Sequence, residues 1–177
     1  MNNSPLTQLM RYTYVRSDMV YRISLLNEFF DFVFFTDHDS VANKDTVRQF
    51  AGNRKEPGKD IDFLKSLPKT FMEIFTRDSF RTVLRDMSDG LQQLPILSLT
   101  VPVAFPLEHT EAIGKWARAT ITPDVMLDIS VDETVYIGCR FVWKNIMHDF
   151  SIEHYFDLHK DDLYTLLSSP IPISTHV

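Results

Sequence analysis

The hydrophobic pattern changes within residues 91–105, which read LQQLPILSLTVPVAF. Before Pro95, apolar side chains recur every three or four residues, which is the spacing of a helix that buries one face. After Pro95, Leu97, Leu99 and Val101 alternate with polar residues, a pattern typical of a half-buried strand. We therefore expect an α+β protein, in which an N-terminal all-helical bundle precedes a small C-terminal α/β domain.

The first half of the chain predicts four to six helices, which together form a domain at 1–95. Ser4 and Pro5 suit the N-cap and the first position of a helix, so 4–35 should form one helix or two in series. The other predicted segments are a short helix at 41–51, a loop at 53–59, a short turn at 61–67 capped by Asp60, and helices within 69–94 that Asp78-Ser79 divides.

The second half predicts the order β-α-β-β-β-α, in a domain at 96–177. Alternating apolar residues predict strands at 97–103, 125–131, 135–143 and 146–149. A helix at 107–119 is predicted between the first two strands, with Ile113, Trp116 and Ala117 on one face. Ser151 should open a final helix that carries Tyr155, Phe156 and several leucines, and Pro170 and Pro172 should end it.

Charge and composition exclude several classes of protein. Residues 1–95 carry no net charge, whereas 96–177 carry the whole net charge of −6, with 5 basic and 11 acidic side chains. An acidic domain binds phosphate backbones poorly, so nucleic acid is not expected as a partner. The acidic half is either a solvated surface or a face for a basic partner. We expect a soluble protein of a reducing compartment, because the sequence has a single cysteine, no long apolar run and no signal-peptide pattern.

Candidate catalytic residues are few. His148-Asp149 is the type of pair that can hold a metal ion in phosphohydrolases, but such sites need further ligands from other helices. Cys139 falls within a predicted strand, where a buried structural role is expected rather than that of a nucleophile. Thr36 to Ser40 resemble the start of a calcium loop without its later glycine and glutamate, so they predict a turn. We expect no catalytic residue, no metal and no cofactor.

One set of residues is more specific than these. Asp132, Gly138, Asp149 and Ser151 occur at spacings that resemble the C-terminal domain of the delta subunit of F-type ATP synthases, called the oligomycin-sensitivity-conferring protein in mitochondria. Residues 100–107, which read TVPVAFPL, resemble the strand that precedes a helix in that family. The resemblance covers 97–167 and departs from the family at Ile137, where a glycine is usual, and at Lys144-Asn145, which replaces a Gly-Asp turn.

This resemblance implies a non-catalytic subunit of the peripheral stalk, or stator. The helical domain would bind N-terminal segments of the alpha subunits, the C-terminal domain would hold the b-type stalk helices, and the chain would resist rotor torque. It would lie peripherally on the energy-transducing membrane, on the cytoplasmic face in bacteria and on the matrix or stroma side in organelles. The four motif residues would be structural. Two alternatives stay open: a metal-dependent hydrolase using His148 and Asp149, and an unrelated two-domain adaptor.

The motif residues also carry physical expectations of their own. A glycine in a strand permits a close approach, so Gly138 should occupy a space that admits no Cβ atom. Ser151 should offer its hydroxyl oxygen to N–H groups in the first turn of the last helix.

Overall fold

A computed structural model describes residues 4–35, 44–52, 54 and 57–168. The described chain is a mixed α/β protein with one four-stranded sheet, as the sequence predicts at that level. Contacts divide it into two compact units, each discontinuous in sequence. The first, called the helical unit here, comprises residues 1–95 with 111–126, and the second, the sheet unit, comprises 96–110 with 127–177.

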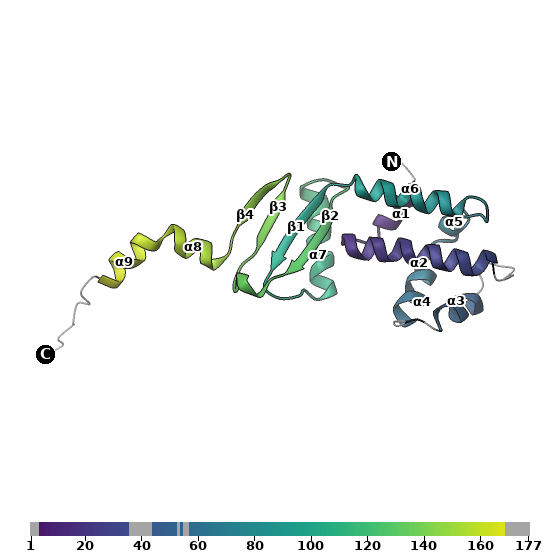
Figure 1. The fold of residues 1–177 in the computed structure, drawn as a ribbon, viewed down its shortest axis with the longest axis horizontal. Coiled ribbons are helices and arrows are strands. Elements are labelled where there is room, and N and C mark those ends of the chain that lie inside the picture. Colours follow the sequence, from purple (N-terminus) through teal and green to yellow (C-terminus); the bar gives the residue numbers. More distant parts are fainter. Residues whose placement is uncertain (1–3, 36–43, 53, 55–56, 169–177) are drawn as a thin grey trace. The chain divides into compact units, whose positions relative to one another are not determined.

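Among the described residues, the helical unit contains six helices and most of a seventh (Figure 1). They are α1 (Pro5–Met10), α2 (Arg16–Phe35), α3 (Lys44–Ala51), α4 (Pro57–Ser66), α5 (Lys69–Met72), α6 (Phe80–Gln92) and the later part of α7 (Leu107–Thr120). Two helices in series over 4–35 are therefore confirmed. Ser4 is the N-cap of α1 and accepts a hydrogen bond from the N–H of Thr7 at 3.2 Å, also as predicted.

The core of the helical unit is rich in phenylalanine. Phe29, Phe30, Phe71 and Phe80 are almost completely buried. The ring of Phe30 stacks on that of Phe75 with centroids 4.4 Å apart, and it forms tilted pairs with Phe29 and Phe80. Offset and tilted ring pairs add to the free energy of apolar burial, so these rings help to hold α2 against α6 and against the segment that follows α5.

Several local predictions for the helical unit are wrong. Pro57 begins α4, although 53–59 was expected to be a loop, because proline suits the first turn of a helix. Asp60 is buried within α4 instead of capping a turn, and it accepts hydrogen bonds from Tyr21 and Arg54. Trp116, which was expected on the same face of its helix as Ala117, is 57% exposed, whereas Ala117 is buried. The expected turn at 36–40 and the start of the helix expected at 41–51 lie outside the described residues; α3 accounts for the rest of that helix.

Arg118 explains why part of α7 groups with the N-terminal helices. Its guanidinium donates hydrogen bonds to the backbone carbonyls of Met10 at 2.6 Å, Thr13 at 2.8 Å and Val125 at 3.2 Å. It also lies 4.6 Å from the centre of the Tyr14 ring. The Tyr14 ring in turn covers Gly114, where an added Cβ atom would come within 2.5 Å of it.

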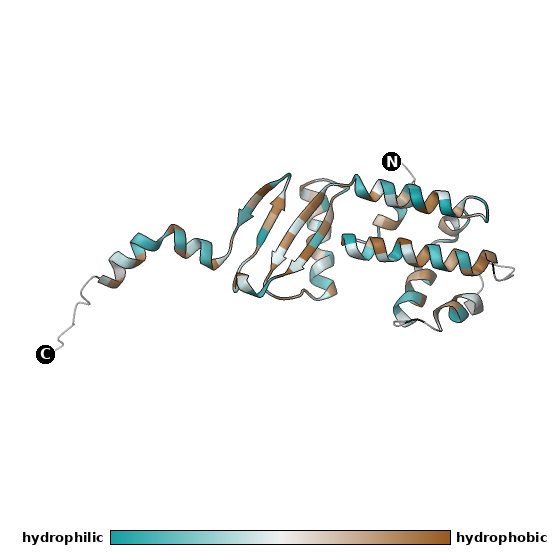
Figure 2. Ribbon diagram, in the orientation of Figure 1, coloured by the Kyte–Doolittle hydropathy of each residue, from teal (hydrophilic) through white to brown (hydrophobic). Residues whose placement is uncertain are grey.

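The sheet has the strand order β2-β1-β3-β4, with β1 at Ile96–Val101, β2 at Met126–Val131, β3 at Arg140–Trp143 and β4 at Ile146–Asp149 (Figure 1). Figure 2 shows that β1 and β2 are largely hydrophobic. The strands β1, β3 and β4 pair antiparallel, in a register that places Leu99, Phe141 and His148 side by side. The N–H of Met126 donates to Pro95 and that of Asp132 to Val101, and this equal offset is the pattern of a parallel β1–β2 pair.

The prediction of a strand at 135–143 is wrong for residues 135–139. Residues Glu133–Val135 form a short 3-10 helix, and the backbone then turns through Tyr136 at φ 52° and Gly138 at φ 97°. β3 therefore begins only at Arg140. The predicted final helix is also two helices, α8 (Ile152–Leu158) and α9 (Lys160–Ser168). The expected stop at Pro170 and Pro172 lies outside the described residues.

Candidate functional site

Gly138 lies where the chain has no room for a side chain. A Cβ atom added there would lie 2.1 Å from the carbonyl oxygen of Phe150, and the positive φ of 97° independently favours glycine. Backbone hydrogen bonds hold the two segments together, from Phe150 to Cys139 at 2.9 Å and from Ile152 to Ile137 at 3.0 Å. The predicted tight space is confirmed, but it lies in a turn before β3, not inside a strand.

Asp149 and Ser151 form the other side of the same corner. The Asp149 carboxylate accepts hydrogen bonds from the Ser151 N–H at 2.8 Å and from Nε of Arg140 at 3.0 Å. The Ser151 hydroxyl oxygen accepts one from the N–H of His154 at 3.3 Å, which confirms the predicted N-cap of α8. Arg140 also reaches Glu153 at 3.4 Å, so β3, β4 and α8 are joined by a single guanidinium.

Asp132 does not join this corner. Its side chain caps the 3-10 helix, accepting hydrogen bonds from the N–H of Thr134 at 2.9 Å and from the Thr134 hydroxyl at 2.7 Å. Three of the four motif residues, Gly138, Asp149 and Ser151, are thus brought together, and they are called the motif corner here. Asp132 stabilises the start of the loop that leads into it.

Hydrogen bonding favours the ionised form of both carboxylates. The side chain and backbone N–H of Ser151, and then Arg140, hold the pKa of Asp149 below its ordinary value. The side chain and backbone N–H of Thr134 lower the pKa of Asp132 in the same way. Both carboxylates are suited to a structural role as anions at neutral pH. A general acid needs the opposite shift, toward a higher pKa.

His148 and Asp149 do not share a site, although the sequence makes them a candidate pair. Successive side chains of a strand point to opposite faces, and both residues lie on β4. The His148 ring stacks on Phe141 at a centroid distance of 4.7 Å, while Asp149 is held in the motif corner. Within the described residues no three His, Cys, Asp or Glu side chains could together hold a metal ion. Cys139 is half-buried, not buried as predicted.

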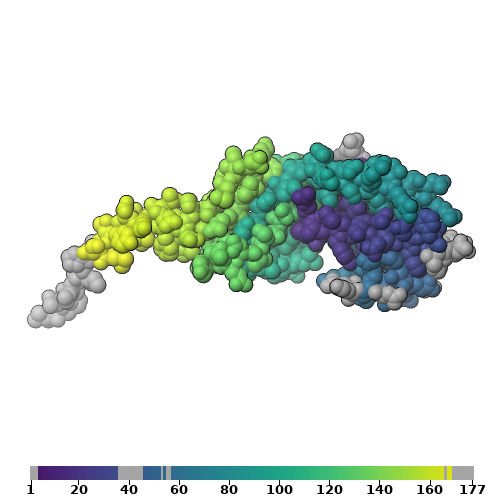
Figure 3. Space-filling view, viewed as in Figure 1, coloured from purple at the N-terminus to yellow at the C-terminus, as the bar shows by residue number. Residues whose placement is uncertain are grey.

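The two helices after the motif corner expose large apolar side chains. Tyr155, Phe156, Leu158, Tyr164 and Leu167 are all exposed, Leu167 by 83%. We call these five residues the C-terminal apolar surface; Figure 3 shows the visible face of α8 and α9, in yellow, uncovered by other segments. Between the two helices is a hollow of about 330 Å³ lined by Phe156, Leu163 and Leu167 among others. The sequence predicted a final helix here that carries Tyr155, Phe156 and several leucines, but not that Tyr155 and Phe156 would be exposed.

Acidic side chains are interspersed with this surface. Glu153, Asp157, Asp161 and Asp162 lie on the same two helices, and Lys160 is the one lysine or arginine among the residues of α8 and α9. Exposed contiguous apolar residues with a charged surround are typical of an interaction site. Around the C-terminal apolar surface, these charged residues are mainly acidic.

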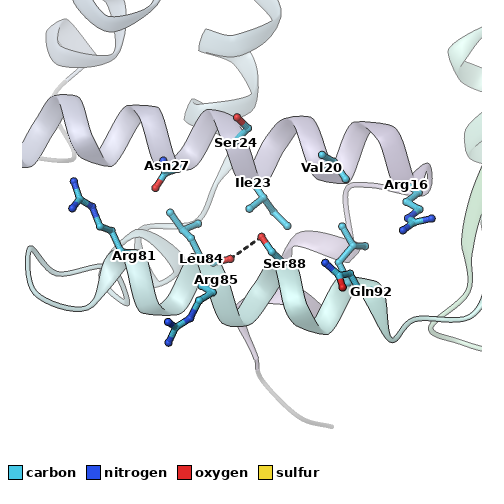
Figure 4. A pocket seen from close by; sticks show the side chains of 11 residues that line it. Arg16, Val20, Ile23, Ser24, Asn27, Arg81, Leu84, Arg85, Ser88 and Gln92 are labelled. Carbon is cyan, nitrogen blue, oxygen red and sulfur yellow. Dashed lines mark hydrogen bonds between the residues drawn. The ribbon is translucent and has the colours of Figure 1, made fainter.

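The helical unit contains a second concave surface, the groove between α2 and α6 (Figure 4). It has a volume of about 480 Å³ and is lined by Arg16, Val20, Ile23, Ser24, Asn27, Arg81, Leu84, Arg85, Ser88, Leu91 and Gln92. All of these residues come from the two helices, so the groove belongs to the helical unit alone.

Comparison with known proteins gives no assignment. No family model matches the chain, and the comparison with curated proteins found no match. Among the described helices, none is both long enough and apolar enough to cross a membrane.

Proposed function

We propose that this chain is a non-catalytic adaptor of the peripheral stalk of an F-type ATP synthase, with the role of its delta subunit. The observation that carries the proposal is the C-terminal apolar surface, which follows directly after the motif corner. An apolar surface of this size on short helices is stabilised by burial against a partner. The acidic residues around it favour a partner helix with basic flanks, as expected of a b-type stalk helix.

The geometry of the motif corner supports the proposal. It gives a structural reason for Gly138, Asp149 and Ser151 to recur in the family that the sequence resembles. Gly138 allows the Phe150–Ser151 backbone to approach, Asp149 fixes the turn, and Ser151 starts α8. Together they set the direction in which α8 leaves the sheet. A family that binds a partner through its last helices needs that direction fixed, and the fixed residues need no catalytic chemistry.

The full proposal assigns one partner to each unit. A helical bundle followed by a small β-α-β-β-β-α domain is the arrangement expected for this family. The helical unit would hold N-terminal segments of the alpha subunits, and the C-terminal apolar surface would hold the stalk. The chain would then work mechanically, as a link that keeps the catalytic head from turning with the rotor. Such a link places the protein peripherally on the energy-transducing membrane.

Co-purification from detergent-solubilised membranes tests this proposal. The full chain, carrying an affinity tag, should recover alpha and b-type subunits of the ATP synthase, identified by mass spectrometry. A Leu167→Asp variant should lose the b-type subunit and keep alpha, because it places a charge at the most exposed residue of the C-terminal apolar surface. Leu107→Asp is a matched control, since Leu107 is also exposed but begins α7.

The outcome separates the proposal from its alternatives. Recovery of an unrelated set of proteins, without ATP synthase subunits, would mean an adaptor of another complex. Loss of the b-type subunit from both aspartate variants would show that the C-terminal apolar surface is not the stalk contact. The hydrolase alternative receives no support from His148 and Asp149, which point to opposite faces of β4.

A further inference from the structure

β4 is an edge strand of the sheet, and no other described segment pairs with its outer side (Figure 1). It pairs with β3 alone, in a regular antiparallel register without a bulge. Natural proteins usually protect such an edge with a proline, a lysine, a bulge or a covering segment. The four residues of β4 read IMHD and include neither a proline nor a lysine. The outer side of β4 is therefore open to main-chain pairing.

The hairpin turn determines which backbone groups of β4 face outward. The two turn residues between β3 and β4 have positive φ angles of 50° and 62°, as in the two-residue loops that close hairpins. The pair that flanks such a loop exchanges backbone hydrogen bonds, and every second pair then does the same. The bond of 2.9 Å from the N–H of Phe150 to the carbonyl of Cys139 fits this alternation. Met147 and Asp149 lie between the bonded pairs, so their N–H and C=O groups point away from β3.

Apolar side chains flank this open edge on both faces of the sheet. Ile146 is 60% exposed and Met147 is 65% exposed, and successive residues of a strand point to opposite faces. A strand added beside β4 would therefore bury apolar side chains on both of its faces. At the opposite edge of the sheet, β2 exposes Asp128 and Ser130, which is typical of a protected edge.

The end of β4 at the motif corner carries net negative charge. Arg140 is paired with Asp149 at 3.0 Å and with Glu153 at 3.4 Å, so one guanidinium serves two carboxylates. The side chain of Glu153 is 61% exposed and can meet a further cation. A basic residue on an added strand, opposite Asp149, complements this end of the edge.

We propose that the outer edge of β4 binds an extended segment of a partner protein as a fifth, antiparallel strand, with apolar residues beside Ile146 and Met147 and a basic residue opposite Asp149. In this mode of binding, main-chain hydrogen bonds supply affinity and alternate side chains supply selectivity. The inference goes beyond the proposed function, which assigns a helical partner to the C-terminal apolar surface.

A second copy of this chain fits the edge less well than a basic strand. If two β4 strands paired antiparallel through both outward-facing residues of each copy, Met147 of one copy would lie opposite Asp149 of the other. An apolar side chain beside a carboxylate adds little to the stability of a sheet. Four residues from each copy are also far fewer than the roughly 20–30 residues a side of a standard interface.

Labelled peptides test the main-chain pairing. The probe has about nine residues, with valines that face Ile146 and Met147, a lysine opposite Asp149 and threonines elsewhere. One N-methylated form blocks the two N–H groups that would bond to β4, and a second is methylated at two N–H groups that point away from it. In fluorescence anisotropy with the full chain, the first form should bind at least about tenfold more weakly than the unmodified peptide, and the second within about threefold of it.

A proline on β4 tests the same pairing from the side of the protein. Met147→Pro removes an outward N–H without removing a bond to β3, and proline is tolerated on an edge strand at such a position. It should weaken binding of the probe by at least about tenfold relative to Met147→Ala, which loses the side chain but keeps the N–H. Circular dichroism checks that both variants are folded; if Met147→Pro is not, the two N-methylated peptides decide the question.

Amide hydrogen exchange, followed by NMR, locates the bound peptide. In the free chain, the N–H groups of Met147 and Asp149 should exchange faster than those of Ile146 and His148, which are bonded to β3. A saturating concentration of the probe should slow exchange at Met147 and Asp149 by at least about tenfold, and at Ile146 and His148 by less than about twofold.

The proposal is overturned if the unmodified peptide does not bind measurably, if the two N-methylated forms bind equally, if the folded Met147 variants bind equally, or if the slowed amides lie outside β4. A dimer of the free chain in sedimentation equilibrium that Met147→Pro dissociates would assign the edge to a second copy instead. These measurements use the pure chain and synthetic peptides. Their failure is therefore distinct from a failure to recover ATP synthase subunits, which tests the proposed function.

Discussion

Replacing Arg118 with methionine should destabilise the helical unit. Methionine keeps an unbranched stem of similar reach but removes all the donors, so the carbonyls of Met10, Thr13 and Val125 lose their hydrogen bonds from the guanidinium. Hydrogen bonds from a charged group contribute about 1.5–3 kcal/mol each. Burial lowers the pKa of Arg118, so the cost of desolvating the guanidinium offsets part of this gain. The net loss should be about 2–4 kcal/mol.

Equilibrium unfolding in urea, followed by circular dichroism, measures this loss on the full chain. Lys115→Met is a matched control on the same helix, because Lys115 forms only an exposed pair with Glu111 at 3.4 Å, and should cost under about 0.5 kcal/mol. Amide hydrogen exchange should also speed up at residues 10–14 in the Arg118 variant alone. A loss below about 0.5 kcal/mol for Arg118→Met, or equal losses for both variants, would refute the reasoning that this guanidinium joins 111–126 to the N-terminal helices.

Three other substitutions test separate features. Gly138→Ala should lower the free energy of unfolding by about 2–4 kcal/mol, because the added Cβ atom would lie 2.1 Å from the backbone and the residue would keep φ at 97°. Gly58→Ala is the control, and it should be nearly neutral because the space around Gly58 is open. Equal effects of the two substitutions would contradict the tight space at Gly138. Asp149 has a lowered pKa in the folded protein, so its stabilising contribution should be complete above its ordinary pKa of about 4 and be lost as the pH falls through the lower folded value. Asp149→Asn should therefore flatten the fall of Tm between about pH 5 and pH 2 relative to the wild type. Tyr21→Phe should cost about 1 kcal/mol of stability by removing the hydrogen bond of 2.9 Å to the buried Asp60, while Tyr12→Phe, at an exposed position, should leave the midpoint in urea unchanged.

The features that the sequence predicted correctly are set by neighbouring residues. The change of period at Pro95 coincides with the start of β1 at Ile96, and Ser4 and Ser151 cap the helices they precede. The start of β1 and the two helix caps each depend on residues that lie within a few positions of one another in the sequence. The break between helices near Ser79 is local in the same way.

Other features depend on contacts that a local pattern does not contain. The alternation of Val135, Ile137 and Cys139 imitates a strand, but the positive φ angles of the turn at Tyr136 and Gly138 are stabilised by backbone from Phe150 to Ile152. The role of Arg118 depends on carbonyls more than one hundred positions earlier in the chain. For the same reason the periodicity of α2 and α6 predicted buried faces but not the row of arginines along the groove between them.

The hydrogen bonds of Arg118 also determine when the helical unit can be completed during synthesis. A ribosome makes α1 to α6 first, then β1, and only later the segment at 111–126 that belongs to the helical unit. Until that segment has emerged, the carbonyls of Met10 and Thr13 have no guanidinium to accept from. The helical unit is therefore completed only after the residues of β1 have been synthesised, and a nascent chain that stalls near Pro95 releases a bundle that lacks its last helix.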